Sequence, residues 1–135
     1  MKLEFTTISG RRMCRLTLAG ATRTALAPET LATLHTATEQ EREHHRQLQR
    51  NEAVAAEQVR ECVSRGADAS QARAELARVR HAVEAASERI DNLEIMAGEV
   101  RDDAAEAIAA QLRQQHADHM AAVAAALPPV PQMEN

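Results

Sequence analysis

The spacing of apolar residues changes once along the chain, and the change predicts two kinds of element. Near the N-terminus, Leu3 and Phe5 alternate with polar residues, and Cys14, Leu16 and Leu18 alternate in the same way. Strict alternation is typical of a strand with one buried face. From Leu31 onwards the apolar residues recur every three or four positions, which is typical of a helix. We therefore predict a mainly α-helical, oligomeric protein, a long helical hairpin or coiled coil with a small N-terminal β-hairpin.

Residues 1–19 fit this hairpin, with Ser9 and Gly10 as a two-residue loop. The loop sets the expected strand pairs, which are Phe5 with Cys14, Leu3 with Leu16, and Glu4 with Arg15. This register gathers the apolar residues on one face and places an opposite-charge pair on the other. A loop shifted by one residue keeps the faces but loses the charged pair. Because a lone two-stranded hairpin is marginal in water, its apolar face needs cover from a helix, another copy or a partner's sheet.

Residues 20–27 are small and polar, and we expect them to form a connector. Helix one is predicted over residues 28–66, because Pro28 suits the first turn of a helix and Gly66 suits the position just past its end. No other proline or glycine lies between these two residues. The sequence therefore predicts a single long helix here.

Helix two is predicted over residues 67–127. Asp68 is expected to cap its N-terminus, with Gln71 as the partner in a capping box. A glycine near the middle leaves open a break at residues 98–102, although the apolar pattern continues through it and favours one continuous helix. The remaining residues, 128–135, are predicted to form a flexible proline-containing tail.

Helix two carries the strongest pattern in the chain. Between Ala72 and Ala104 its apolar residues step by four and three in strict alternation, which is the heptad repeat of a coiled coil. A helix in an ordinary bundle also has an apolar stripe, but the strict repeat favours supercoiling. We expect the seam between copies of the chain to consist of Leu76, Val79, Val83, Ala86, Ile90, Leu93, Ala97 and Val100.

The middle of helix one is polar at the equivalent positions, which are Thr38, Glu41, His45 and Glu52. One interpretation is a zinc site, because the pairs Glu41 with His45 and His116 with His119 have the spacing that shares a helix face. The other is a polar layer, which reduces stability but fixes the register and oligomeric state of a coiled coil. We favour the polar layer and predict neither a metal nor a cofactor.

The composition supports a protein with a thin core. Alanine occupies 29 of the 135 positions, and the chain has one aromatic residue, Phe5. Leu, Ile, Val and Phe together are scarcer than in most self-sufficient domains. We therefore expect other copies to complete the core, which makes the protein a homo-oligomer. Cys14 and Cys62 lie in different predicted elements and are expected to be free thiols in a reducing compartment.

The charge of the chain is unevenly distributed. Residues 1–25 have a net charge of +4, whereas residues 26–66 sum to −2 and residues 67–135 to −6. A basic hairpin can be steered towards an acidic protein surface. No run of like charges suggests a nucleic-acid-binding tail, so we do not expect nucleic acid as a partner. We predict that the docking hairpin uses Leu3, Phe5, Arg11, Arg12, Arg15, Leu16 and Leu18.

The function that these features favour is structural. Sequence signatures of nucleotide-binding loops and of nucleophilic hydrolases are missing, so we do not expect an enzyme. We predict an assembly or adaptor protein that self-associates, docks on another protein of a larger assembly, and belongs to a bacteriophage virion or its assembly machinery. The alternatives are a small regulator or inhibitor that binds another protein through a helical face, and a histidine-based metal or pH sensor. With neither a signal peptide nor a membrane-spanning run, we expect a cytoplasmic or virion-associated protein.

Overall fold

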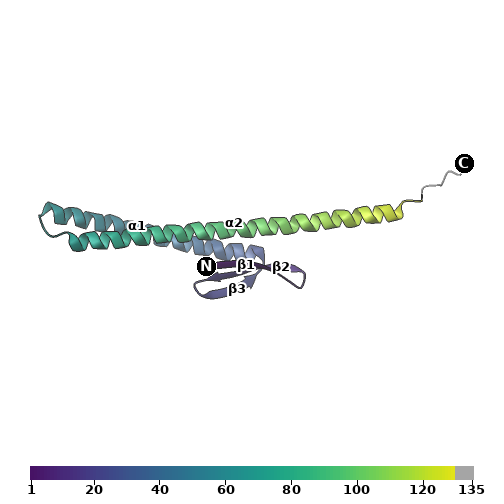
Figure 1. Ribbon diagram of the computed structural model, residues 1–135, viewed down its shortest axis with the longest axis horizontal. Helices are drawn as coiled ribbons and strands as arrows, with labels where there is room; N and C mark the ends of the chain where they lie inside the picture. The colour runs from purple at the N-terminus through teal and green to yellow at the C-terminus, as the bar shows by residue number, and fades with distance from the viewer. Residues whose placement is uncertain (130–135) are drawn as a thin grey trace. The chain divides into compact units, whose positions relative to one another are not determined.

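The structure, a computed structural model, describes residues 1–129 and contains three strands followed by two long helices (Figure 1). The chain is mainly helical, as the sequence predicted. Residues Met1–Arg101 form one compact unit, and the chain from Asp102 onwards forms a second. The elements in chain order are β1 (Lys2–Ile8), β2 (Arg11–Leu18), β3 (Ala21–Ala25), α1 (Ala27–Ser64) and α2 (Ser70–Ala126).

The first two strands form the hairpin in the predicted register. Ser9 and Gly10 have φ angles of 52° and 78° and make the two-residue loop. Two consecutive positive φ angles are the signature of a type I′ turn, whose twist matches that of the flanking strands. The pairs Leu3 with Leu16, Glu4 with Arg15 and Phe5 with Cys14 are all present, so the preferred loop is confirmed.

The prediction that residues 20–27 form a connector was wrong for most of the segment. Ala19 and Gly20, with φ angles of 49° and 79°, form a second two-residue turn, and β3 (Ala21–Ala25) returns along β2. The result is a three-stranded antiparallel sheet in the order β1-β2-β3. In this segment Thr22 and Thr24 alternate with Ala21, Arg23 and Ala25, which is a weak apolar signal, but threonine is β-branched and favours a strand.

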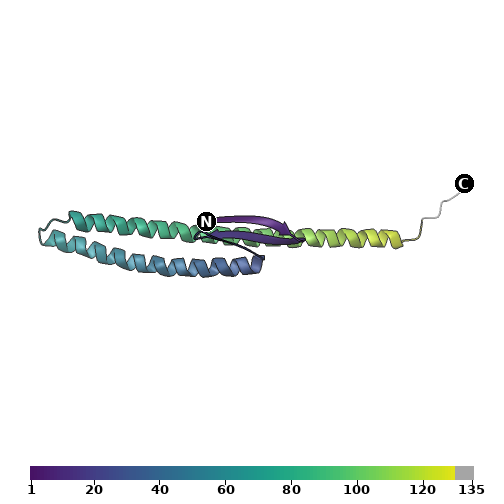
Figure 2. The same ribbon diagram turned by 90° about the horizontal axis from the view of Figure 1, so that it is seen from below.

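The core of the first unit joins the sheet to both helices. Cys14 and Leu16 of β2 face Leu34 of α1, and the three side chains pack with residues of α2. The helices run antiparallel to each other from the short loop between them (Figure 2). The buried residues that form this cluster are Cys14, Leu16, Leu34, Leu93, Met96 and Val100.

The heptad seam of α2 is therefore covered within one chain. Of the eight seam residues, four are buried: Leu76, Ala86, Leu93 and Val100. The other four are partly buried: Val79, Val83, Ile90 and Ala97. Their burial does not require a second copy, and association between copies through this seam stays a prediction.

The ends of α1 follow the expected local chemistry. Pro28 lies in its first turn. After the last helical residue, Gly66 has a φ of 64°, and the Ala67 N–H donates to the Cys62 carbonyl over 2.9 Å. Many helices end in this way, with a glycine in the left-handed conformation and a hydrogen bond that spans five residues instead of four. The hydrogen bond satisfies one of the last carbonyl groups of the helix.

The start of α2 is capped by Asp68. Its Oδ1 atom accepts a hydrogen bond from the Ser70 backbone N–H over 3.0 Å and another from the Ser70 hydroxyl over 2.6 Å. The side-chain partner of Asp68 is thus Ser70, rather than the Gln71 that we expected. The helix then runs unbroken through Gly98, so the possible break at 98–102 is not present. Of the predicted tail, residues 130–135 lie outside the described part of the chain.

Candidate functional site

The N-terminal sheet has two faces of different character. Residues alternate between the faces along each strand, so the residues opposite Cys14 and Leu16 form the outer face. Most of these outer residues are exposed and polar or charged. We call this surface the outer face; it consists of Lys2, Glu4, Thr6, Ile8, Arg11, Met13, Arg15, Thr17, Thr22 and Thr24.

The structure divides the residues that we predicted as one docking surface. Arg11 and Arg15 lie on the outer face. The inner face, which packs on the helices, carries Leu3, Phe5, Arg12, Leu16 and Leu18. Leu16 has only 4% of its surface exposed, and the Arg12 guanidinium lies 5.6 Å from the centre of the Phe5 ring. The apolar half of the predicted docking surface is thus already occupied by the chain's own core.

Two apolar residues on the outer face were not expected to take part in docking. Ile8 is 46% exposed, and Met13 is partly buried beside it in an open groove of about 650 Å³. The available signal was that Met13 shares a strand face with Arg11 and Arg15 and that Ile8 is the cross-strand partner of Arg11, but two isolated apolar residues are a weak signal. The residues that line the groove are Ile8, Ser9, Arg11, Met13, Thr24, Ala25, Leu26 and Glu29.

The outer face has a positive charge. Lys2, Arg11 and Arg15 contribute three positive charges against the carboxylate of Glu4. Glu4 forms an ion pair with Lys2 over 2.9 Å. Lys2 holds the pKa of Glu4 below its ordinary value, through its hydrogen bond first and its positive charge second. The more distant charge of Arg15 acts in the same direction. The carboxylate therefore stays ionised at neutral pH, and the net charge of the face is +2.

The sheet also presents backbone groups for pairing. β1 and β3 are the two edge strands of the sheet, and each pairs with β2 on one side only. Alternate N–H and C=O groups of an edge strand point away from its neighbour, where they can bind another strand. β1 is the longer edge, with seven residues from Lys2 to Ile8.

The polar middle of α1 faces α2. Thr38 is buried, and its hydroxyl donates to the Leu34 carbonyl over 2.7 Å. Arg89 of α2 donates to Glu41 over 3.1 Å, and Arg80 of α2 lies 3.9 Å from Glu52. These pairs join two helices of one chain, so a polar layer that fixes the oligomeric state stays a prediction. Polar pairs of this kind favour one alignment of the helices over its neighbours.

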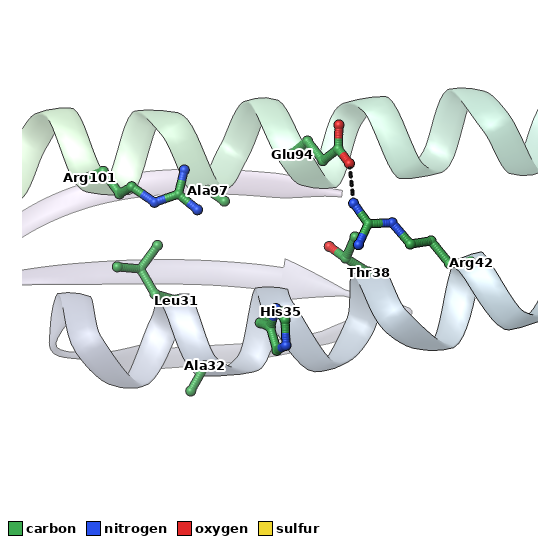
Figure 3. A pocket seen from close by; sticks show the side chains of 8 residues that line it. All are labelled: Leu31, Ala32, His35, Thr38, Arg42, Glu94, Ala97 and Arg101. Carbon is green, nitrogen blue, oxygen red and sulfur yellow. Dashed lines mark hydrogen bonds and ion pairs between the residues drawn. The ribbon is translucent and has the colours of Figure 1, made fainter.

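Beside this layer lies a groove of about 640 Å³ between α1 and α2 (Figure 3). Arg42 donates to Glu94 over 2.6 Å and to Glu39 over 2.7 Å. These two hydrogen bonds raise the pKa of Arg42, and the bond to Glu94 has the larger effect. The guanidinium is thus engaged in a structural contact between the helices. The remaining groove residues are Leu31, Ala32, His35, Thr38, Ala97 and Arg101.

The histidines do not gather with other metal ligands in the part of the chain that the structure describes. No group of three or more His, Cys, Asp and Glu residues within residues 1–129 is arranged to hold a metal ion. Cys14 is buried and Cys62 is partly buried, and no disulfide joins them. Neither described helix combines the length and the apolar character that crossing a membrane requires.

Comparison of the chain with protein families, with characterised proteins and with solved structures found no match.

Proposed function

We propose that the protein is a non-enzymatic assembly or adaptor protein that docks on an acidic surface of another protein through the outer face and the β1 edge of its sheet. The single observation that carries the proposal is the division of the sheet. Its apolar face is used inside the chain, with Leu16 buried, whereas Arg11 and Arg15 lie on the opposite, solvent-exposed face.

The outer face offers three kinds of contact to a partner. The backbone of β1 can add a strand, which supplies affinity through hydrogen bonds. Arg11 and Arg15 can form paired hydrogen bonds with carboxylates, which supply orientation. Ile8 and Met13 offer a small apolar contact at the turn end of the sheet. Together these contacts suit a protein surface with an exposed strand and acidic side chains.

The helical hairpin suits the supporting role in such a protein. Its two helices are joined by ion pairs at several levels, of which Arg42 with Glu94 is the closest. Exposed ion pairs contribute little stability individually, so we assign them to alignment of the helices. A helical hairpin whose two helices keep one alignment gives the sheet that packs on it a defined position. The setting that we predict, a bacteriophage virion or its assembly machinery, is compatible with this role.

A second candidate function uses the groove between α1 and α2. Leu31 and Ala97 are partly buried there, and Arg101 and His35 are exposed beside them. A helix of a target protein can lie in such a groove, in the manner of a small regulator or inhibitor. This candidate places the partner on the helices and leaves the sheet uncovered.

The proposal is tested by charge reversal on the outer face. Arg11→Glu with Arg15→Glu in the full chain should reduce capture of the partner from extracts of the source cells at least tenfold. The matched control reverses two exposed arginines of the helices, Arg60 and Arg78, and should leave capture intact. Added salt should weaken the native contact in the same direction as the arginine reversal. Equal capture by the outer-face variant and the wild type would contradict docking through this face.

A further inference from the structure

The second unit of the chain carries an apolar stripe along α2. Within the described residues, five large apolar side chains from residue 108 onwards are between 40% and 65% exposed. For comparison, Leu93 of the same helix is 2% exposed. The five residues of this C-terminal stripe are Ile108, Leu112, Met120, Val123 and Leu127.

The stripe occupies one side of the helix. Ile108 and Leu112 are four residues apart, and Met120, Val123 and Leu127 continue with steps of three and four. Residues at these spacings share a helix face. The gap between Leu112 and Met120 is filled on the same face by His116, which is exposed.

The remaining surface of this segment is polar or consists of alanine. Gln114 donates to Asp118 over 2.9 Å on the side away from the stripe. Ala105 and Ala109 flank Ile108 and are small enough to let another helix approach closely. The segment thus has the amphipathic pattern of a helix that packs against a partner on one side.

We infer that a second copy of this chain covers the stripe, so that residues 104–126, the last part of α2, pair as helices in two copies. The charge of the segment favours this occupant. Its charged residues are Glu106, Arg113 and Asp118, which sum to −1. Two copies therefore meet without strong repulsion, whereas a strongly acidic or basic partner gains little from such a face.

The area of the stripe also fits a dimer. Burying a large apolar side chain removes on the order of 100 Å² from water, and these side chains are about half exposed. With the flanking alanines, each copy would bury roughly 400 Å² and the pair roughly 800 Å², which is below the size of a stable interface and in the range of weak, transient contacts. A contact of this size is expected to form and dissociate reversibly, so that the fraction of paired chains depends on concentration. The same residues on two identical helices form a symmetric contact, which is the common form of a homodimer.

This inference deepens the self-association that belongs to the proposed assembly role, but it is tested separately from docking. Sedimentation equilibrium of the full chain should show a mass that rises with concentration from one chain to two. Ile108→Glu with Leu112→Glu should weaken the association at least tenfold. The matched control, Ile95→Glu with Val54→Glu, changes two residues that are each 59% exposed elsewhere on the helices and should not weaken it.

Three outcomes would overturn the inference. The first is a single-chain mass at every concentration up to the solubility limit. The second is an unchanged association constant in the Ile108→Glu and Leu112→Glu variant, with helix content confirmed by circular dichroism. The third is an equal loss in the control variant. Arg11→Glu with Arg15→Glu should leave the mass unchanged, so failure of docking and failure of pairing are distinguished.

Discussion

Replacing Leu93 with alanine should destabilise the protein strongly, because this side chain connects the sheet to both helices. Leu93 is 2% exposed and packs in the cluster formed by Cys14, Leu16, Leu34 and others. The substitution removes three carbon atoms from the core, at about 0.8 kcal/mol each for lost burial. The cavity left behind adds to this cost, and comparable substitutions cost about 2–5 kcal/mol in total. We therefore expect a loss of about 3 kcal/mol in the free energy of unfolding.

Ile95→Ala is the matched control, since it lies two residues away on the same helix and is 59% exposed. Less than half of its side chain is buried, so the loss of burial is below about 1 kcal/mol. The higher helix propensity of alanine offsets part of that loss. The two variants should consequently differ by more than about 1.5 kcal/mol in the same assay.

Urea unfolding followed by circular dichroism measures the difference in the free energy of unfolding, and thermal unfolding followed in the same way gives the melting temperatures. At about 4 °C per kcal/mol, the melting temperature should fall by about 12 °C for Leu93→Ala and by little for Ile95→Ala. Equal effects of the two substitutions would refute the packing of α2 against α1 and the sheet within one chain. A sharp dependence of the Leu93→Ala effect on protein concentration would refute it too, since the core would then lie between copies.

Two further predictions concern the helix cap and the histidines. The hydrogen bonds from Ser70 lower the pKa of Asp68, so the ionised form stabilises the fold at neutral pH, and this contribution is lost as the pH falls through the lowered pKa. Asp68→Ala should thus lower the melting temperature at pH 7, with the gap to the wild type closing as the pH falls below the ordinary pKa of an aspartate carboxyl; a gap that widens in acid would contradict the cap. Zinc and chelator should leave the melting temperature unchanged, whereas a bound metal would add about 2.7 kcal/mol at a hundredfold excess over its dissociation constant. A zinc-dependent rise in melting temperature that His45→Ala or His119→Ala abolishes would show that the histidines bind metal.

Most of the fold could be predicted because the chain follows strong local rules. The heptad of α2, the glycine after α1 and the Ser9-Gly10 turn each depend on residues close together in sequence. β3 was missed because Ala19 takes a positive φ that alanine rarely adopts, and because Thr22 and Thr24 give no apolar alternation. β3 is stable only when it pairs with β2, and the few residues of β3 alone do not indicate this pairing.

The candidate site was predicted less well than the fold. The sequence placed Leu16 and Arg15 on opposite faces of the hairpin, but it could not show whether a helix of the same chain, another copy or a partner's sheet would cover the apolar face. That choice depends on α1 folding back onto β2, where Leu34 meets Cys14. The heptad seam posed the same problem, since periodicity indicates a partner helix without indicating whether the partner is α1 or another copy.

Hydrogen exchange on the captured complex tests the central claim most directly. The full chain is compared alone and bound to its partner, and the protection of backbone amides is measured along the sequence. Docking through the sheet predicts that amides of β1 gain protection on binding, while those lining the groove between α1 and α2 do not change. Protection that appears along the groove, around Leu31 and Ala97, and leaves β1 unchanged would contradict the account.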